Sequence, residues 1–383
     1  MSSTRLAILS PAARGPMSLP ASMGQLVAEV ESHQEVWGCW LQSWDMPVTA
    51  GEIAPFLDEL SRQALHQERE VIWAPMSSAD SAVRLVLHGT AQPEALRRAL
   101  TTLHLQNFMP GRVLHCQDND LALILHGPRG PLSAVNHRLI EALEGIALDV
   151  AVSPLWDKGH FRLLLTDMDS TLISIECIDE LAEHLGLRRQ VAAITERSMA
   201  GELDFQTSLR ERVRLLAGTP ASSIDTIIRE RLRLNPGARE LVAAAKSQGV
   251  EVGVVSGGFT QFTRHLQEAL DLDYAFANTL EIIQGQITGQ VLGDIVDAAA
   301  KADILDLLAI GLGTDASHCI ALGDGANDLP MIRKAGIGIA YHAKAAVRAQ
   351  ADFQIRYGGL DTAAAYLGWN TARASHFGQH CDT

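Results

Sequence analysis

From residue 161 onward, short apolar runs alternate with segments of helical character, and this alternation limits the fold more than any other feature of the chain. The apolar runs cover residues 163–166, 252–255, 319–322, 337–340 and 353–355. Apolar strands separated by helices indicate a parallel sheet covered on both faces, and therefore an α/β fold with a Rossmann-like core. Ligands bind beyond the carboxyl ends of the strands in such sheets. Because polar motifs follow the runs at those ends, the sequence predicts one functional site there.

Residues 181–234 interrupt the alternation with a helical, charge-rich insert. An insert at this point of an α/β fold would lie near the carboxyl edge of the sheet, so we expect it to form a cap over the site. We therefore predict an α/β domain over residues 160–366 that contains this cap, followed by a C-terminal tail at 367–383.

Residues 80–155 have a different pattern, which predicts a separate α+β domain. Strand, helix, strand, strand, helix and strand follow one another, which is the βαββαβ order of a ferredoxin-like unit. This order resembles the ACT domain, a small regulatory module. The resemblance implies binding of serine or another amino acid and, because such modules often pair side by side, a homodimer. Before it we expect a loose leader at 1–24, rich in Ser, Pro, Ala and Gly, and a segment of unassigned fold at 25–79.

The charge and the apolar pattern of the chain exclude some partners. The 31 basic and 45 acidic residues give a formal net charge of -14. Because such a surface repels polyphosphate, we expect no nucleic-acid partner. No run approaches the roughly 18 apolar residues that cross a bilayer, so we expect no membrane attachment. The five scattered cysteines have no C-x-x-C spacing and are typical of reduced thiols, which favours a cytoplasmic location.

The first polar motif, Asp-Met-Asp-Ser-Thr at 167–171, follows the run 163–166 directly. Side chains at i and i+2 of an extended chain point the same way, so Asp167 and Asp169 should lie about 6–7 Å apart along the chain and face one pocket. Two like charges about 4 Å apart repel by roughly 4 kcal/mol at an effective dielectric constant of 20. A divalent cation or a shared proton would remove that cost. The alternative is a solvated turn in which Ser170 and Thr171 begin the next helix.

Two further features follow along the chain. Ser256-Gly257-Gly258 comes after the run 252–255, and a hydroxyl followed by two glycines lets backbone N–H groups approach an anion. Lys301 opens a predicted helix, where a lysine is slightly unfavourable to the helix dipole, and this indicates a role in a site. Taken singly, each feature is also consistent with an ordinary turn or a solvated lysine.

The fourth motif is Gly-Asp-Gly-Ala-Asn-Asp at 323–328, after the run 319–322. Its Asp324, Asn327 and Asp328 place hard oxygen ligands on a tight turn. Mg²⁺ prefers such oxygens, usually one or two carboxylates together with water and a substrate phosphate. The motif is not an EF-hand, because the glycine and the terminal Glu of that loop are missing. The alternative is a structural turn.

The four motifs in this order resemble the haloacid dehalogenase superfamily, whose pattern runs Asp-x-Asp-x-Thr, then Ser or Thr, then Lys, then Gly-Asp-x-x-x-Asp. The resemblance covers residues 161–357 and implies a phosphatase that uses Mg²⁺. It implies Asp167 as the nucleophile, Asp169 as the general acid and base, and Lys301 as a catalytic cation. The residues that it implies around the metal ion are Asp167, Asp169 (through its carbonyl), Asp324 and Asp328.

Within the superfamily, five stretches resemble the enzymes that hydrolyse O-phosphoserine to serine and phosphate, the last step of serine biosynthesis. These stretches are DMDSTLISIECIDELA at 167–182, LDFQTSLRERVRLL at 203–216, VVSGGFTQF at 254–262, LDYAFANTL at 272–280 and GDGANDLPMI at 323–332. The resemblance implies that Glu176 binds the substrate ammonium, that Arg212 binds its carboxylate, and that Met199 and Phe205 exclude water. The residues that it implies around the phosphoryl group are Ser256, Gly257, Lys301 and Asn327.

Three other functions stay open from the sequence. The same chemistry could act on another small phosphate monoester, such as homoserine phosphate or a sugar phosphate. A phosphotransferase that passes phosphate to an alcohol would use the same residues. The chain could also be an amino-acid-sensing regulatory protein with an inactive phosphatase half, although the intact acid, lysine and metal positions argue against this.

Overall fold

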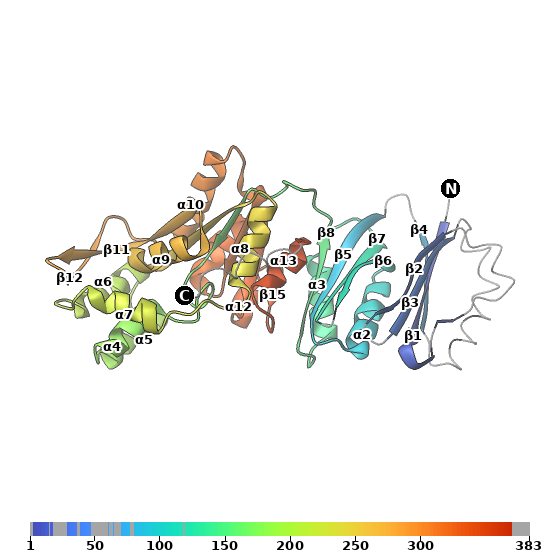
Figure 1. Ribbon diagram of the computed structural model, residues 1–383, viewed down its shortest axis with the longest axis horizontal. Helices are drawn as coiled ribbons and strands as arrows, with labels where there is room; N and C mark the ends of the chain where they lie inside the picture. The colour runs from blue at the N-terminus through green and yellow to red at the C-terminus, as the bar shows by residue number, and fades with distance from the viewer. Residues whose placement is uncertain are drawn as a thin grey trace, which may run out of the picture. The chain divides into compact units, whose positions relative to one another are not determined.

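The chain divides into two compact units (Figure 1). The computed structural model describes residues 3–14, 16–17, 29–36, 39–46, 60, 64, 70–76, 80–117 and 119–369. The N-terminal unit comprises Met1–Trp156 and Ala365–Gly368, and the C-terminal unit comprises Asp157–Ala364 and Trp369–Thr383. Each unit has its own β-sheets.

Six elements of the N-terminal unit form an antiparallel sheet with two helices. They are β5 (Ser81–Gly89), α2 (Pro93–His104), β6 (Met109–Gln117), β7 (Asp120–Gly127), α3 (Ser133–Ala142) and β8 (Leu148–Pro154). The strand order is β6-β7-β5-β8, and each neighbouring pair is antiparallel. The observed βαββαβ order is the one that the sequence predicts over 80–155. The resemblance of this sheet to an amino-acid-binding ACT domain stays a prediction.

A second sheet of the N-terminal unit corrects the prediction of a loose leader for residues 3–11, while residues 18–24 of that predicted leader lie outside the described residues. Its strands, in spatial order, are β2 (Glu29–Val36), β3 (Cys39–Met46), β1 (Ser3–Pro11) and β4 (Glu70–Met76). β1 is therefore an inner strand, paired on both sides. The leader was predicted from its Ser- and Pro-rich composition, but residues 6–9 are apolar and buried, and their burial favours the strand. Pro11 is tolerated because it ends the strand.

The apolar faces of the two N-terminal sheets share one core. Leu9 and Leu41 of the second sheet belong to the same buried cluster as Leu85, Leu96 and Leu123 of the ferredoxin-like part. The segment 25–79, whose fold the sequence did not assign, supplies β2, β3 and β4 to this arrangement.

The C-terminal unit contains a seven-stranded sheet in the order β12-β11-β10-β9-β13-β14-β15. Its strands are β9 (Leu163–Thr166), β10 (Glu251–Phe259), β11 (Tyr274–Ile283), β12 (Gln286–Leu292), β13 (Cys319–Gly323), β14 (Ile337–Tyr341) and β15 (Phe353–Ile355). All neighbouring pairs are parallel except β11 and β12. The parallel α/β core predicted from the apolar runs is confirmed.

The strand β9 lies in the middle of this sheet and is covered on both faces. Leu163, Leu164 and Leu165 are fully buried, as expected for a parallel strand with helices on both sides. The chain adds β10 on one side of β9 and, later, β13 on the other side. Ligands of open α/β sheets bind at the carboxyl ends of the strands beside such a reversal of strand order. The helices that follow these strands are α8 (Ala238–Ser247), α9 (Thr260–Leu270), α10 (Ala298–Gly311), α11 (Leu329–Lys334), α12 (Ala345–Arg348) and α13 (Asp361–Leu367).

Four helices separate β9 from α8 and form the insert. They are α4 (Cys177–His184), α5 (Arg188–Met199), α6 (Phe205–Leu215) and α7 (Ser222–Glu230). The predicted cap at 181–234 contains these helices except the first part of α4. Asp204 caps the N-terminus of α6 by accepting a 2.8 Å hydrogen bond from the Thr207 N–H. α6 packs against β12, and this contact joins the insert to the sheet (Figure 1).

The hairpin of β11 and β12 was not among the predicted strands. Its turn contains Gln284 and Gly285, whose φ angles are 51° and 78°, and Ile283 pairs with Gln286 across it. Positive φ at both central residues fits a type I′ turn, which favours glycine at the second position. A Gly-containing pair between two apolar stretches was therefore an available hairpin signal in the sequence.

None of the helices within the described part of the chain combines the length and the apolar character needed to cross a membrane. Residues 370–383 of the predicted C-terminal tail lie outside the described residues.

Candidate active site

Four segments far apart in the sequence meet at the carboxyl edge of the seven-stranded sheet. Asp167 follows β9 directly, Ser256 lies in β10, Asp324 follows β13, and Lys301 lies in the first turn of α10. Because β9 is the neighbour of both β10 and β13, the strand ends that carry these residues are adjacent. The fold therefore brings all four predicted motifs to one site.

Lys301 connects two of the motifs through buried ion pairs. Its Nζ lies 2.6 Å from Asp167 Oδ1 and 2.7 Å from Asp328 Oδ1, and its side chain is only 1% exposed. Burial opposes the charged form of the lysine, but the two carboxylates outweigh burial and raise the Lys301 pKa. A buried charge is tolerated when it is paired and hydrogen-bonded in this way. Lys301 is thus a fixed cation within the site.

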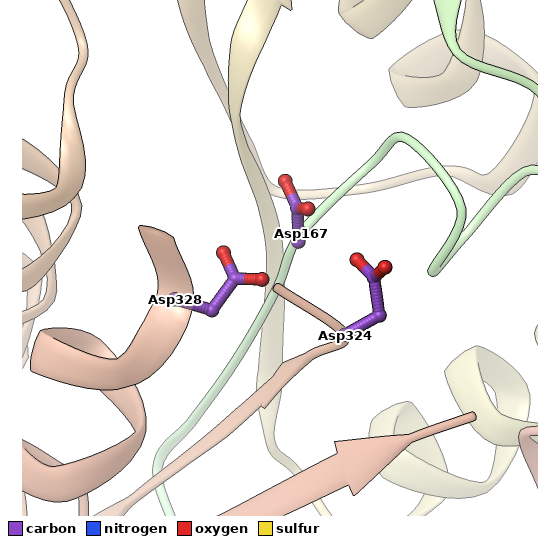
Figure 2. Close-up of side chains that lie close together, drawn as sticks. All are labelled: Asp167, Asp324 and Asp328. Atoms are coloured by element: carbon purple, nitrogen blue, oxygen red, sulfur yellow. The ribbon is translucent and has the colours of Figure 1, made fainter. Parts of the chain in front are cut away.

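The side chains of Asp167, Asp324 and Asp328 form an acidic cluster. Figure 2 shows them projecting from separate segments of the backbone, and one carboxylate oxygen of each lies within 4.8 Å of the others. Burial, with the charge of Asp328, raises the pKa of Asp167 well above its ordinary value and that of Asp324 to about 6. The single Lys301 ammonium does not balance three carboxylates, and carboxylate oxygens are the ligands that hard divalent cations prefer. The residues of the cluster therefore fit a divalent metal ion.

Asp169 lies beside the cluster and has its own partners. Its Oδ1 accepts a 3.1 Å hydrogen bond from the Cys177 N–H at the start of α4, and its Oδ2 accepts one of 3.4 Å from the Ser256 hydroxyl. Burial, followed by the charge of Glu176, raises the Asp169 pKa to about 7. A carboxyl group with a pKa near neutrality can give and take a proton at neutral pH.

The glycines after Ser256 permit close approaches that a side chain would block. A Cβ atom at Gly257 would lie 2.9 Å from the ring of Phe205, and one at Gly258 would lie 2.8 Å from Asp169 Oδ2. The Gly258 N–H donates a 2.8 Å hydrogen bond to Ser256 Oγ. Phe205, from the insert helix α6, is therefore in position to cover the backbone of this loop.

Glu176 and Arg212 belong to the insert side of the site. Glu176 precedes α4 and accepts a 2.7 Å hydrogen bond from the Ser170 hydroxyl, and desolvation of its carboxylate by the surrounding protein raises its pKa. Arg212 is half-buried on α6, where its Nε donates a 3.4 Å hydrogen bond to the Ser208 carbonyl. Burial lowers the Arg212 pKa, whereas the charges of Asp179 and Glu176 oppose that shift. Glu176 and Arg212 thus attract one another across this side of the site.

Asn327 and Met199 are the last two predicted residues of the site. Asn327 belongs to the short turn η4 (Ala326–Asp328), and its Nδ2 donates a 3.4 Å hydrogen bond to Asp328 Oδ1. Met199 ends α5, but its side chain lies outside the described residues. The structure therefore places Asn327 beside the acidic cluster, while the contact of Met199 with substrate stays a prediction.

Sequence reasoning missed three contacts within the site. The Thr171 hydroxyl donates a 3.3 Å hydrogen bond to Asp324 Oδ1, Ser170 supports Glu176, and the Cys177 N–H supports Asp169. Ser170 has a φ of 58°, which bends the chain, and the next helix begins only at Cys177. The alternative in which Ser170 and Thr171 begin a helix is therefore wrong. The threonine of Asp-x-Asp-x-Thr was the available signal for Thr171, whereas a backbone donor such as the Cys177 N–H leaves none.

Comparison with known proteins assigns the α/β unit to a class. Residues 164–333 match the haloacid dehalogenase-like hydrolase family. Over 208 residues, the chain is 50% identical to the phosphoserine phosphatase of Albidiferax ferrireducens, a match that covers 53% of this chain and 88% of that protein. The chain therefore belongs to the haloacid dehalogenase-like hydrolase family.

The similar solved structures include a HAD family hydrolase, t0658, from Salmonella enterica, with a TM-score of 0.67 and 30% identity, covering 74% of this chain and 98% of that chain. They also include phosphoserine phosphatases. The probable phosphoserine phosphatase of Vibrio cholerae, in its unliganded form, is similar with a TM-score of 0.63 and 37% identity, covering 77% of this chain and 88% of that chain. A phospho-aspartyl intermediate analogue of phosphoserine phosphatase is similar with a TM-score of 0.51 and 40% identity, covering 54% of this chain and 99% of that chain.

Proposed function

We propose that the chain is a magnesium-dependent phosphatase that hydrolyses O-phosphoserine to serine and inorganic phosphate, the last step of serine biosynthesis. The observation that carries the proposal is the buried Lys301, which contacts both Asp167 and Asp328 at an acidic cluster that includes Asp324. The 50% identity to a phosphoserine phosphatase supports the choice of substrate.

Asp167 is the proposed nucleophile of the first step. One of its oxygens would form a bond to phosphorus while the bond from phosphorus to the serine oxygen breaks, so that one difficult hydrolysis becomes two easier steps. Burial and the charge of Asp328 raise the Asp167 pKa, whereas the Lys301 ammonium, 2.6 Å from Asp167 Oδ1, lowers it and so favours the ionised carboxylate that this attack requires. The similarity to a phospho-aspartyl intermediate analogue supports the same assignment.

Asp169 is the proposed general acid and, later, the general base. It would give its proton to the departing serine oxygen and then take a proton from the water that attacks the aspartyl-phosphate. A pKa of about 7 suits a group that must be protonated in one step and ionised in the next. The groups proposed to hold the phosphoryl oxygens are Lys301, the Ser256 hydroxyl and the Gly257 N–H, with Asn327 orienting them.

The proposed Mg²⁺ ligands are the side chains of Asp167, Asp324 and Asp328, with the Asp169 carbonyl as a further donor. When bound, the ion supplies positive charge that offsets the repulsion between a carboxylate nucleophile and a phosphate dianion. The acidic cluster, in which a single lysine faces three carboxylates, supports this assignment.

The insert is the proposed source of substrate selectivity. Glu176 would bind the substrate ammonium, and Arg212 would bind its carboxylate with two parallel N–H bonds. Phe205, which lies against Gly257, would exclude water around the leaving serine together with Met199. Opening and closing of the insert would then control turnover.

Three further proposals concern the rest of the molecule. We propose that the ferredoxin-like sheet binds serine or another amino acid, that the chain forms a homodimer, and that it acts in the cytoplasm. The first rests on the βαββαβ order of β5 to β8, and the other two rest on the sequence resemblance and composition.

Phosphate release from a panel of esters tests the proposed reaction. With Mg²⁺ present, the purified chain should hydrolyse O-phosphoserine with a much higher kcat/KM than phosphothreonine, homoserine phosphate or a sugar phosphate. A sugar phosphate that is hydrolysed as fast as phosphoserine would place the chain among the phosphatases of other small monoesters. Phosphate transfer to an added alcohol in place of free phosphate would identify a phosphotransferase.

The substitution Arg212→Ala should impair recognition of the substrate carboxylate. Because a hydrogen bond to a charged group contributes about 1.5–3 kcal/mol, the KM for phosphoserine should rise about 10- to 100-fold. The KM for phosphoethanolamine, which has the ammonium and the phosphate but no carboxylate, should change little. Arg210→Ala removes an exposed arginine from the same helix and serves as the control. Equal changes in KM on both substrates would remove Arg212 from carboxylate binding.

Removal of divalent metal should abolish phosphate release and lower the Tm. A ligand that binds only the folded state adds about 2.7 kcal/mol to the free energy of unfolding at 100 times its Kd, so restoring Mg²⁺ should raise the Tm again. Asp324→Asn removes one proposed ligand and should raise the half-saturating Mg²⁺ concentration at least about tenfold. Asp225→Asn, at an exposed acid on α7, is the control. Full activity after chelation would contradict the metal assignment.

A further inference from the structure

Asn278 is a buried polar residue next to the site that the proposed mechanism does not use. It lies on β11, is 1% exposed, and both ends of its side-chain amide are hydrogen-bonded. Its Nδ2 donates a 2.8 Å bond to the Gly257 carbonyl, and its Oδ1 accepts a 2.8 Å bond from the Val296 N–H. One side chain therefore joins the loop after Ser256 to the segment that precedes α10.

The bond from Asn278 Nδ2 to the Gly257 carbonyl takes the place of a backbone hydrogen bond that the sheet does not make. The parallel pairing of β10 with β11 is interrupted between Val255 and Phe259. Irregular pairing leaves backbone groups without a ladder partner, and buried groups of this kind need another one. The Asn278 amide supplies that partner to the Gly257 carbonyl. The irregular loop thus keeps a defined conformation although the sheet does not pair it.

Fixing the Gly257 carbonyl also fixes the next N–H group. The peptide unit is planar and trans, so the Gly257 C=O and the Gly258 N–H point in opposite directions along one rigid plane. That N–H donates the 2.8 Å bond to Ser256 Oγ, and the Ser256 hydroxyl lies 3.4 Å from Asp169 Oδ2. Asn278 therefore acts, through one peptide plane, on the orientation of the Ser256 hydroxyl.

The second bond concerns the start of α10. Val296 precedes Asp297, the N-cap of α10, whose side chain accepts hydrogen bonds from the Ala299 and Ala300 N–H groups. The Lys301 N–H then bonds to the Asp297 carbonyl at 3.0 Å. A shift of the Val296 segment would move the first turn of α10, and with it the buried Lys301.

We propose that Asn278 is a positioning residue for phosphoryl transfer. Its two hydrogen bonds fix the position of the 257–258 peptide relative to the start of α10. Ser256 and Lys301 then face the same phosphoryl group. The inference rests on the proposed phosphatase function and adds a residue outside the four motifs. A displacement of about 1 Å at reacting groups can lower a rate about 100-fold, so the two hydrogen bonds of Asn278 matter to the rate as well as to stability.

Two substitutions at Asn278 and two matched controls test the inference. Asn278→Asp keeps the acceptor for the Val296 N–H but loses the donor to Gly257, and Asn278→Ala loses both. Asn136, 5% exposed on α3, makes the same pair of bonds in the N-terminal unit, to the carbonyl and the N–H of Val152 at 3.0 and 2.6 Å. Asn136→Asp and Asn136→Ala therefore remove equivalent hydrogen bonds in the other unit of the chain.

For both Asn278 variants, the kcat for phosphoserine should fall about 10- to 100-fold, and the Ki for inorganic phosphate should rise with it. The Asn136 variants should lower the Tm while kcat and the phosphate Ki stay at wild-type values. If the Asn278 variants lower only the Tm, as the Asn136 variants do, Asn278 has a structural role and the inference is wrong. Asn278→Asp decides the matter if Asn278→Ala does not fold, because it retains one bond. An inactive wild-type chain in the same assay would instead contradict the proposed function.

Discussion

Asp167→Asn should lower the kcat for phosphoserine about 10⁴- to 10⁶-fold, the range that the loss of one catalytic residue covers in a well-studied hydrolase. The amide has nearly the shape of the carboxylate but lacks the negative charge that attacks phosphorus. It also removes one of the two carboxylates that pair with Lys301 in the buried ion pair. Single-turnover measurement of phosphate release is the appropriate assay, because it separates chemistry from product release.

The loss of rate must be distinguished from a loss of fold. Asp167→Asn keeps a hydrogen-bonding side chain next to the Lys301 ammonium. The Tm should therefore change little, although the kcat falls by orders of magnitude. Inorganic phosphate should still bind, because Ser256, Gly257 and Lys301 are unchanged. A folded variant with more than about one-tenth of the wild-type kcat would remove Asp167 from the nucleophile position.

Lys301→Met should reduce both activity and stability. The substitution leaves the carboxylates of Asp167 and Asp328 buried without their shared cation. Breaking a buried ion pair by removing one partner costs about 3–5 kcal/mol, which a urea titration can measure. Loss of a fixed charge aimed at the phosphoryl group should in addition lower kcat/KM about 10³-fold.

Lys334→Met is the matched control for Lys301→Met. Lys334 pairs with Asp306 at 2.5 Å, but this pair lies near the surface, with the lysine 33% and the aspartate 41% exposed. Exposed pairs contribute about 0–1 kcal/mol, so its loss should barely change the free energy of unfolding or kcat/KM. A Lys301→Met enzyme with wild-type kcat/KM would show that the buried lysine serves the fold alone.

Local pattern predicted the α/β unit well, because its signal lies in short stretches of sequence. A buried parallel strand needs a continuous apolar run, and β9, β13 and β14 all arise from such runs. The strand β1 was missed because its Ser- and Pro-rich surroundings suggested a leader. Whether the run at residues 6–9 becomes a strand depends on β3 and β4, which pair with it from distant parts of the chain.

The site residues also differ in whether local sequence predicts their role. Asp167, Lys301, Asp324 and Asp328 lie in motifs with recognisable chemistry, and the fold brings their side chains together. Asn278 lies in the stretch LDYAFANTL at 272–280, which resembles the phosphatases, but nothing local marks it as a hydrogen-bond partner of Gly257. That partnership arises from the irregular pairing of β10 with β11, which only the three-dimensional structure reveals.

Acid quenching of the wild-type enzyme during turnover of radiolabelled phosphoserine, followed by peptide mapping, tests the central claim most directly. The label should appear on one peptide that contains Asp167, as an acyl phosphate that hydroxylamine releases. Asp167→Asn, treated identically, should carry none. Label on a peptide without Asp167, or equal labelling of the Asp167→Asn enzyme, would contradict the account.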